Sequence, residues 1–288
     1  MILINILTYI TWSVDPDIFT IPFIDHPVRW YGVLFASAFI ITQQVMYFVY
    51  KKEGRSRSEI DTLTVYMVVG TIIGARLGHV LFYAPSYYFQ HPLKILAVWE
   101  GGLASHGAAI SLPIALYLFA RRTKVGYRWL LDRMVIVVSL AGCMIRLGNL
   151  MNSEMIGLPT DLPWGFIFTS VDNVPRHPAQ LYEAIYCLIL SFILFGIWYR
   201  YRSRIQDGSM FGWFLITIFG LRIVDEFFKV NQESFEDGMT LNMGQILSIP
   251  LVITGIIILL SNLRKSKAML NSGSISSVDQ TPPIDSHQ

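Results

Sequence analysis

The stretch WLLDRMVIVVSLAGCMIRLGNLM spans Trp129–Met151 and continues with NSEMIG at residues 152–157. Its apolar length suits a helix that crosses a membrane, which takes about 20 residues. Its end, however, carries Arg146 and Asn149, and a charge at membrane depth costs at least ~2.5–3.5 kcal/mol per residue. A charged residue at this depth therefore usually pairs with another residue or binds a ligand. The stretch therefore predicts a membrane-spanning fold with a polar site at one end of a span.

The polar residues of this stretch are spaced for a common task. If the helix continues, Arg146, Asn149 and Asn152 share one face because they are three residues apart. A guanidinium is a planar fork of five donors that suits phosphate. Carboxamides donate and accept, Glu154 accepts or, when protonated, donates, and Gly157 lets a backbone or a ligand come close. We therefore predict a binding site for an anionic head group at the membrane edge.

The composition of the chain points to lipid as its solvent. Hydrophobic residues make up 53% of the 288 residues and charged residues 15%, whereas soluble domains carry about 25% charged residues. Seven apolar runs are long enough to span a membrane. They are Trp30–Tyr50, Leu63–Tyr83, Ile95–Ala120, Trp129–Met151, Ala179–Tyr199, Met210–Phe228 and Gly244–Asn262. The third run contains EGG at residues 100–102 and Pro113, which predict a broken or re-entrant element. Cys143 and Cys187 lie in apolar runs and are expected to be packing residues.

The charges of the connecting loops orient the chain. Fourteen of the 22 Lys and Arg residues lie in the segments 51–57, 121–128, 200–204 and 264–267. These segments fall on one side of the predicted spans, and the positive-inside rule assigns that side to the cytoplasm. The sequence thus predicts an all-α, polytopic membrane protein of seven transmembrane helices, with its N-terminus outside and its C-terminus in the cytoplasm.

Three regions follow from this pattern. Residues 1–29 are predicted to be an interfacial segment, with Trp12, Phe19 and Phe23 as membrane anchors. The segment is not expected to be a signal peptide, because its apolar stretch has no basic residue before it and no small-residue cleavage site after it. Residues 30–263 form the transmembrane domain. Residues 264–288 are predicted to be a cytoplasmic basic segment followed by a disordered tail.

Four arginines lie inside the predicted spans, and this is the strongest physical sign of a site. They are Arg76, Arg133, Arg146 and Arg222. Arg133 is close to a cytoplasmic end, where we expect its side chain to snorkel. Arg76 and His79 lie among small residues that allow close helix packing, so we expect structural roles for both.

Arg222 and Glu226 are four residues apart and can pair on one helix face. By themselves they fit a phosphate site and a structural ion pair equally well, but two separate intramembrane arginines favour an anion site. His106, next to Gly107 in the third run, is either a general base near neutral pH or a polar residue bonded to a neighbouring helix, and its residue type leaves both open. Tyr31 is more often an aromatic-belt residue than a catalyst. Gln180, Tyr182 and Glu183 form a polar cluster at a predicted helix start, which needs no catalytic part.

Several motifs resemble, in the same order, those of the bacterial prolipoprotein diacylglyceryl transferase family. The longest is RLGNLMNSEMIG at residues 146–157. The others are WYG at 30–32, GARLG at 74–78, GG at 101–102 with HG at 106–107, HPAQLYE at 177–183, Arg222 with EFF at 226–228, and MGQILS at 243–248. The resemblance extends from about residue 30 to residue 262.

The resemblance implies an enzyme of the bacterial cytoplasmic (inner) membrane whose active site opens to the outer leaflet. Such an enzyme transfers the diacylglyceryl group of phosphatidylglycerol to the lipobox cysteine thiol of a preprolipoprotein, the first step of bacterial lipoprotein maturation. It forms a thioether and releases glycerol phosphate. The expected partners are phosphatidylglycerol, the lipid bilayer and preprolipoprotein signal peptides with a lipobox cysteine, and neither a nucleic acid nor a metal or other cofactor is expected.

The resemblance also assigns roles to single residues. The family's functional positions fall on Tyr31, His106, Arg146, Asn149, Gly157 and Arg222. We expect His106, Arg146 and Arg222 to be catalytic, because the two arginines can stabilise the leaving phosphate and His106 can act as the base for the substrate thiol.

The remaining polar residues are expected to bind or orient. Glu154 and Glu226 are expected to orient the two arginines, while Asn149 and Asn152 hold oxygen atoms of the phosphatidylglycerol head group. Tyr31 and Gly157 complete the expected binding site.

Two other classes of protein are compatible with parts of the pattern. Intramembrane arginines and a broken third run also suit a transporter or a lipid-binding channel. A different phospholipid head-group transferase should show clusters of metal-ligating aspartates, and the predicted helices contain none.

Overall fold

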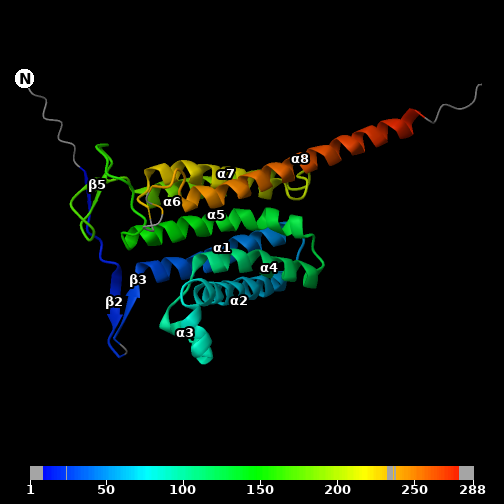
Figure 1. Ribbon diagram of the computed structural model, residues 1–288. Helices are drawn as coiled ribbons and strands as arrows, with labels where there is room; N and C mark the ends of the chain where they lie inside the picture. The colour runs from blue at the N-terminus through cyan, green and yellow to red at the C-terminus, as the bar shows by residue number, and fades with distance from the viewer. Residues whose placement is uncertain (1–8, 24, 232–235, 237, 279–288) are drawn as a thin grey trace, which may run out of the picture.

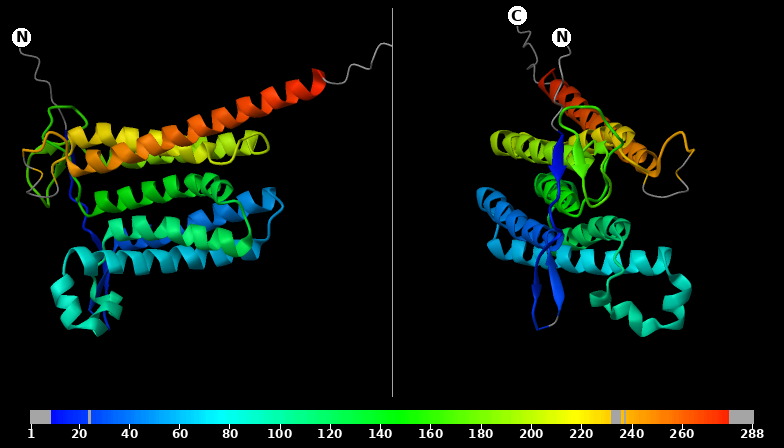
Figure 2. Two further views of the ribbon diagram at one scale, coloured as in Figure 1. Left: turned by 45° about the vertical axis from the view of Figure 1, so that its right-hand side comes forward. Right: turned by 90° about the vertical axis from the view of Figure 1, so that its left-hand side faces the viewer.

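The computed structural model of the chain describes residues 9–278 except 24, 232–235 and 237. It is a bundle of long helices that run along one common direction, with short strands gathered at one end (Figure 1). The long helices are α1 (Trp30–Lys52), α2 (Arg57–Phe82), α4 (Ser105–Thr123), α5 (Tyr127–Met151), α6 (Ala179–Tyr201), α7 (Ser209–Asp225) and α8 (Met243–Val278). Helix α5 lies in the middle and packs on α1 and α6, while α2 pairs with α4 and α7 with α8 (Figure 2).

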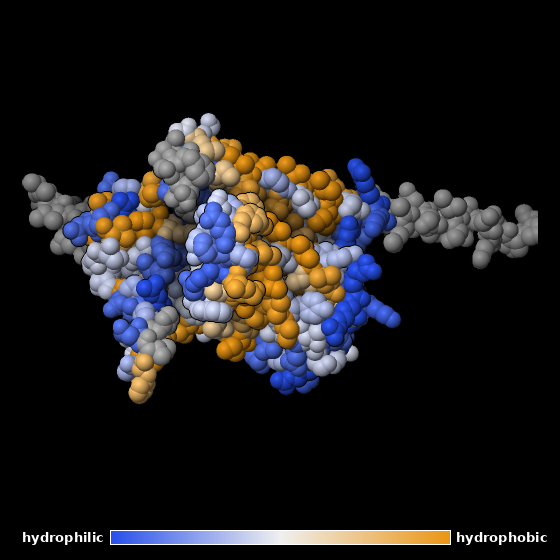
Figure 3. Space-filling view, turned by 60° about the horizontal axis from the view of Figure 1, so that its bottom comes forward, coloured by the Kyte–Doolittle hydropathy of each residue, from blue (hydrophilic) through white to orange (hydrophobic). Residues whose placement is uncertain are grey.

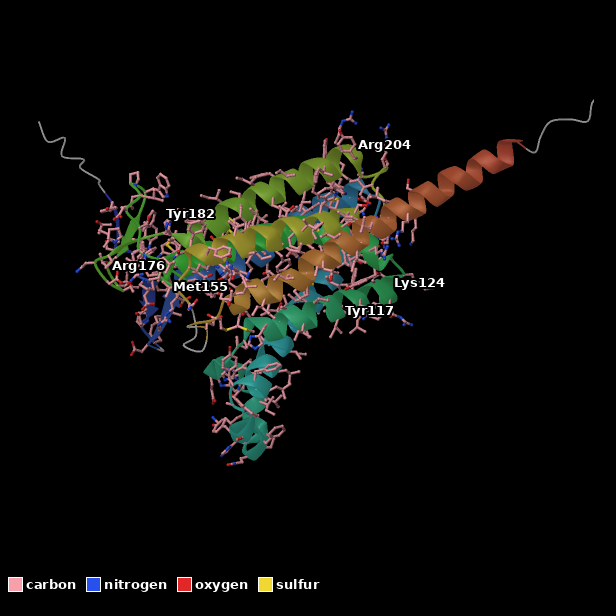
Figure 4. The ribbon with its side chains drawn as sticks, turned by 45° about the horizontal axis from the view of Figure 1, so that its top comes forward. Tyr117, Lys124, Met155, Arg176, Tyr182 and Arg204 are labelled. Atoms are coloured by element: carbon pink, nitrogen blue, oxygen red, sulfur yellow. The ribbon has the colours of Figure 1, made fainter. Side chains whose placement is uncertain are left out.

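We name the two ends of the bundle by what they carry. The strand end holds the strands, the end of α5 at Met151 and the start of α6 at Ala179. The basic end holds Lys124 and Arg204, which lie opposite Arg176 and Tyr182 of the strand end (Figure 4). All four predicted basic loops connect helices or continue a helix at this end, as the charge pattern requires.

The surface between the two ends is hydrophobic. Figure 3 shows hydrophobic residues over the middle of the bundle and hydrophilic residues gathered at both ends. Large apolar side chains such as Ile72, Leu118 and Ile257 are exposed there, whereas the interior is filled by Phe119, Leu194 and other side chains around Trp198. A belt of this kind is the surface that a protein presents to lipid.

Among the residues that the structure describes, five helices are long and apolar enough to cross a membrane, namely α1, α2, α5, α6 and the part of α8 from Met243 to Ser266. Within the described residues, α4 and α7 do not qualify by length and composition, although both run alongside the other five (Figure 1). The chain is therefore a multi-pass membrane protein by its structure, and the full set of seven spans stays a prediction. Helix α8 continues past the predicted end at Asn262 to Val278, and the rest of the predicted tail lies outside the described residues.

The third predicted span is broken, as the sequence indicated. Residues 92–100 form two short 3-10 helices, η1 (Pro92–Leu96) and η2 (Val98–Glu100), after the six-residue helix α3 (Pro85–Gln90). Gly101 and Gly102 then take φ values of 86° and 70°, which favour glycine. Helix α4 begins only at Ser105, ten residues later than predicted.

The prediction of an all-α fold is wrong in one respect, because the described part of the strand end contains five short strands. They are β1 (Ile10–Trp12), β2 (Asp17–Ile21), β3 (His26–Arg29), β4 (Phe166–Phe168) and β5 (Pro175–Arg176). Strands β2 and β3 form a hairpin, while β4 pairs in parallel with β1 and antiparallel with β5. The long loop between α5 and α6 is thus tied to the N-terminal segment.

Trp12, one of the three predicted membrane anchors, contacts the end of α5, and its role as an anchor stays a prediction. Its indole Nε1 donates to the carbonyl oxygen of Leu150 at 3.0 Å, and its ring packs beside Phe166. It thereby joins β1 to the end of α5. Phe19 and Phe23 are exposed, and their role as membrane anchors stays a prediction.

Arg133 does not snorkel, contrary to the prediction from the sequence. Its side chain is buried, and its Nη2 lies 2.9 Å from Glu53 Oε1. The indole of Trp198 also donates to Glu53, and the guanidinium lies over the ring of Trp129. Because Glu53 follows α1, this cluster joins α1, α5 and α6 at the basic end.

Arg76 has the structural role expected of it. Its guanidinium donates to four carbonyl oxygens, those of Lys94, Ile95, Gly101 and Gly102, at 2.5–3.2 Å. These carbonyls belong to the broken segment before α4. A single buried arginine of α2 therefore fixes the irregular chain that leads to His106.

Helices α2 and α4 approach so closely that only glycine fits between them. A Cβ atom on Gly78 would lie 2.7 Å from the Cα atom of Gly107, and one on Gly74 would lie 2.7 Å from the carbonyl oxygen of Gly107. Real Cβ atoms essentially never lie so close to backbone, so a larger residue would separate the helices. This close approach sets where the start of α4 lies.

The substitution Gly78→Ala tests this packing. We expect it to lower the free energy of unfolding by about 1–3 kcal/mol, the usual cost of overpacking. Gly196→Ala in α6 is the matched control, because a Cβ there would meet nothing within 4 Å and alanine favours a helix by about 1 kcal/mol. Thermal unfolding of both variants in one detergent should show only the first to be less stable, and equal shifts would contradict the packing argument.

Candidate functional site

The charged residues singled out in the sequence meet at the strand end, where α5 ends, α6 begins and α7 ends. Figure 4 shows Met155, Arg176 and Tyr182 at this end of the bundle. Arg146 and Asn149 come from the last turns of α5, and Arg222 from the last turn of α7. Helix ends place these side chains at the edge of the hydrophobic belt rather than at its middle.

Arg146 is held from several sides. Its Nε lies 2.6 Å from Glu183 Oε2, and its Nη1 lies 3.4 Å from Asn149 Oδ1 and 3.0 Å from the sulfur of Met155. The predicted common face of Arg146 and Asn149 is therefore confirmed. The partner carboxylate, however, is Glu183 of α6 rather than Glu154, which corrects the predicted orienting role of Glu154.

Glu154 is instead the acceptor for the two carboxamides. Asn149 donates to its Oε2 at 3.2 Å, and Asn152 donates to its Oε1 at 3.1 Å. The Glu154 backbone oxygen accepts from the buried Gln180 at 3.0 Å. These contacts hold the Glu154 carboxylate near the guanidinium of Arg146, but the two groups do not form an ion pair with each other.

The loop that carries Glu154 has an unusual backbone. Ser153 and Met155 have φ values of 54° and 55°, in the left-handed region that non-glycine residues rarely adopt. Such a conformation costs of order 1–3 kcal/mol and is often found at binding sites. The two residues flank Glu154, so the strained backbone lies on both sides of the residue whose carboxylate accepts from Asn149 and Asn152.

A buried ion-pair network links the two arginines. The ammonium of Lys229 contacts the carboxylate of Glu183 and lies 3.2 Å from Asp225 Oδ2 and 3.3 Å from Glu226 Oε1. Arg222 Nε lies 3.6 Å from Glu226 Oε1, so the predicted pair of Arg222 and Glu226 is present. The network therefore runs from Arg146 through Glu183, Lys229 and Glu226 to Arg222.

Gly157 and Tyr31 both lie beside the network for packing reasons. The amide of Gly157 donates to the His177 carbonyl oxygen at 2.9 Å, and a Cβ on Gly157 would lie 2.5 Å from that oxygen. A neighbouring backbone, rather than open space, therefore requires this glycine. Tyr31 packs over Gly148, two residues beyond Arg146, where a Cβ would lie 2.8 Å from the tyrosine ring.

His106 belongs to a different part of the strand end. It is the second residue of α4, its side chain is exposed, and its ring contacts Phe82, the last residue of α2, and Tyr83, which follows it. In the described part of the chain no hydrogen bond or ion pair joins it to the arginines. The structure thus brings together the predicted site residues of α5 and α7 but leaves His106 apart from them.

His177 and Tyr182 face the loop between α5 and α6. Trp164 donates to the Tyr182 hydroxyl at 3.0 Å, and His177 Nδ1 lies 3.2 Å from the same oxygen. Burial lowers the pKa of His177 from its ordinary value, which favours a neutral ring at pH 7. His177 and Tyr182 therefore contact each other and the loop beside the site, and they are not members of the ion-pair network described above.

The sequence pattern does not identify Glu183 and Lys229 as members of the network. It places Glu183 in a polar helix start and does not single out Lys229. The spacing of Lys229 from Asp225 and Glu226, four and three residues, was a usable signal for a local cluster. No spacing could show that Glu183 completes it, because that contact joins α6 to the end of α7.

Comparison with known proteins gives a consistent picture. Residues 16–261 match the model of a family described as prolipoprotein diacylglyceryl transferase. A phosphatidylglycerol–prolipoprotein diacylglyceryl transferase of Tolumonas auensis is 44% identical over 250 residues, which cover 86% of this chain and 96% of the relative. Proteins of the same name from Chloroherpeton thalassium and Porphyromonas gingivalis are 43% and 44% identical, over 90% and 86% of this chain and 97% and 93% of theirs.

The substitution Glu183→Gln tests how much the fold depends on the network. Removing one partner of a buried ion pair leaves a charge uncompensated, so we expect a loss of about 3–5 kcal/mol in the free energy of unfolding. Glu100→Gln is the matched control, because Glu100 pairs with Lys94 in an exposed position and such pairs contribute about 0–1 kcal/mol. Denaturant unfolding of both variants checks this, and similar losses would show that the buried network is not special.

Proposed function

The chain belongs to the prolipoprotein diacylglyceryl transferase family, and we propose that the network at the strand end is where its transfer reaction takes place. The chain is a transferase of lipoprotein biosynthesis, which moves the diacylglyceryl group of phosphatidylglycerol to a prolipoprotein. The observation that supports this location is the convergence of Arg146 and Arg222, each beside a buried carboxylate, at one end of a lipid-facing bundle.

The transfer exchanges one covalent bond for another. A carbon–sulfur bond forms between the lipobox cysteine and C3 of the lipid glycerol, while the bond from C3 to the phosphate oxygen breaks. The bonding electrons leave with the phosphate, so the products are a thioether and glycerol phosphate. Negative charge develops on the leaving phosphate, and the thiol must lose a proton.

The two arginines are the groups that meet the developing charge. Arginine forms charge-assisted, often bidentate hydrogen bonds with phosphate, and fixed donors aimed at a leaving group are typically the largest source of rate enhancement. Asn149, Asn152 and Glu154 form a hydrogen-bonded set beside Arg146. We assign to this set the glycerol head group, whose hydroxyls need both donors and acceptors, with Tyr31 and Gly157 shaping the site.

His106 is the proposed base for the thiol. A free cysteine has a pKa of about 8.5, so a base or a positive field assists its ionisation. The exposed position of His106 at the start of α4 supports this role. Because its ring does not contact the arginines, the substrate thiol would have to lie between the two groups of residues.

The proposed topology brings both substrates to the strand end. The chain would lie in the bacterial inner membrane with seven spans, the N-terminus and the strand end outside and the basic end in the cytoplasm. The position of Lys124 and Arg204 at the basic end supports this orientation (Figure 4). Phosphatidylglycerol of the outer leaflet and the lipobox of a signal peptide would then reach the same site.

The substitution Arg146→Ala tests the phosphate role. We expect the transfer rate to fall by about 10²–10³-fold or more, the usual effect of losing one donor that stabilises a developing charge. The assay is mass spectrometry of a lipobox peptide incubated with purified protein and phosphatidylglycerol, in which transfer adds one diacylglyceryl group. Arg121→Ala is the control, because Arg121 lies at the basic end and its side chain bonds to the exposed Tyr117. Near-normal transfer by folded Arg146→Ala would remove Arg146 from the chemistry.

The substitution His106→Gln tests the base. General base catalysis contributes about 10²–10⁴-fold, so we expect a loss of this size at pH 7. We expect the loss to shrink as the pH rises towards 9, because the thiol then ionises without a base. His91→Gln, which removes an exposed histidine of the loop after α3, should leave the rate unchanged. A pH-independent loss in His106→Gln would indicate a role other than proton transfer.

A further inference from the structure

Lys229 is the most buried charged side chain of the network. Its side chain is 1% exposed, and its ammonium contacts three carboxylates, those of Glu183, Asp225 and Glu226. Two of these carboxylates are also the partners of Arg146 and Arg222. Lys229 is therefore the cation that both arginine–glutamate pairs share.

The backbone of Lys229 and its neighbours is also bonded to the backbone of the loop after α5. Lys229 forms a bridge with Gly157, the amide of Val230 donates to Ile156, and the amide of Leu158 donates to Phe228. The ammonium is thus anchored relative to α5, α6 and α7 together. A displacement of Lys229 would be felt at both arginines.

The charges of the network form two layers. The buried layer holds Lys229 and its three carboxylates, whose side chains are 1–6% exposed. The outer layer holds Arg146 and Arg222, which are 15% and 34% exposed. Three cations balance three carboxylates. Without the lysine the two arginines alone would face all three carboxylates, and the cluster would carry a net negative charge.

We propose that Lys229 is a positioning residue that neutralises the buried carboxylates, so that Arg146 and Arg222 keep their positive charge for the phosphate of an anionic glycerophospholipid. It acts through Glu183 and Glu226 and does not itself contact the lipid. The proposal rests on the proposed function, because it takes phosphatidylglycerol as the ligand of the two arginines.

The substitution Lys229→Gln tests the proposal in purified full-length protein. We expect the dissociation constant for phosphatidylglycerol in detergent micelles, and the KM for it in the peptide assay, to rise tenfold or more. A purely structural role would reduce the amount of folded protein but leave the constants of the folded fraction unchanged. Lys94→Gln is the matched control, because Lys94 pairs with one glutamate in an exposed position and should leave both constants unchanged.

Asp225→Asn gives a prediction of opposite sign. Asp225 contacts Lys229 but has no ion pair with either arginine, so its neutralisation leaves the cluster with an extra positive charge. We expect an unchanged or lower dissociation constant and KM for phosphatidylglycerol. General damage to the network would instead raise both constants, as in Lys229→Gln. This variant therefore decides the matter if Lys229→Gln does not fold.

The outcomes separate this proposal from the proposed function. If the wild-type protein neither binds phosphatidylglycerol nor transfers its diacylglyceryl group, the proposed function fails. If the wild type does both and folded Lys229→Gln has wild-type constants, or if Asp225→Asn weakens binding tenfold, only the role of Lys229 is overturned.

Discussion

The ion pair between Arg146 and Glu183 is the contact on which the strand end depends, because it places opposite charges of two helices together at the edge of lipid. Removing an ion from water costs several kcal/mol even after relaxation, and a partner with good geometry is needed to offset it. Here the pair is extended by Lys229 and Glu226 to Arg222, so three helix ends are joined by one neutral cluster. The loop after α5 is bonded to the backbone of residues 228–230 beside that cluster.

Helix α5 carries a polar anchor at each of its ends. At the basic end, Asp132 accepts from the amides of Gly208 and Phe211 at the start of α7, and Arg133 pairs with Glu53 after α1. At the strand end, Arg146 pairs with α6. Between these anchors the helix is apolar. These polar contacts fix the position of α5 relative to its neighbours. They are needed because lipid provides no hydrophobic driving force for helix association.

The local features of the site could be predicted from the sequence, and the long-range ones could not. The common face of Arg146 and Asn149 and the pair of Arg222 and Glu226 follow from helical spacing. The break before α4 follows from its glycines. The partner of Arg133, Glu53, is 80 residues away, so helical spacing does not reveal that Arg133 is buried. Likewise, spacing along the chain favours Glu154 as the partner of Arg146, whereas packing supplies Glu183 of α6.

The sequence does not predict the strands, again because contacts between distant residues form them. Strands β1 and β4 have three residues each, and they exist only because residues 10–12 lie beside residues 166–168. Strands so short have no periodicity of their own to detect. The residue type of Trp12 indicates a lipid interface, but it does not show that the same amphipathic indole bonds the end of α5.

The layering of charge explains how a neutral cluster can still attract an anion. A ligand that approaches the strand end meets the more exposed guanidinium groups first, and the carboxylates lie deeper, at 3% and 6% exposure. Coulomb energy falls with distance and with the dielectric constant between the charges, so the nearer arginines outweigh the carboxylates behind them. Glu183 contacts the Nε edge of the Arg146 guanidinium at 2.6 Å and thereby orients it, whereas Glu226 lies 3.6 Å from Arg222 Nε and holds that arginine by charge alone. The arrangement therefore places the carboxylates beneath the arginines and leaves their positive field directed outwards.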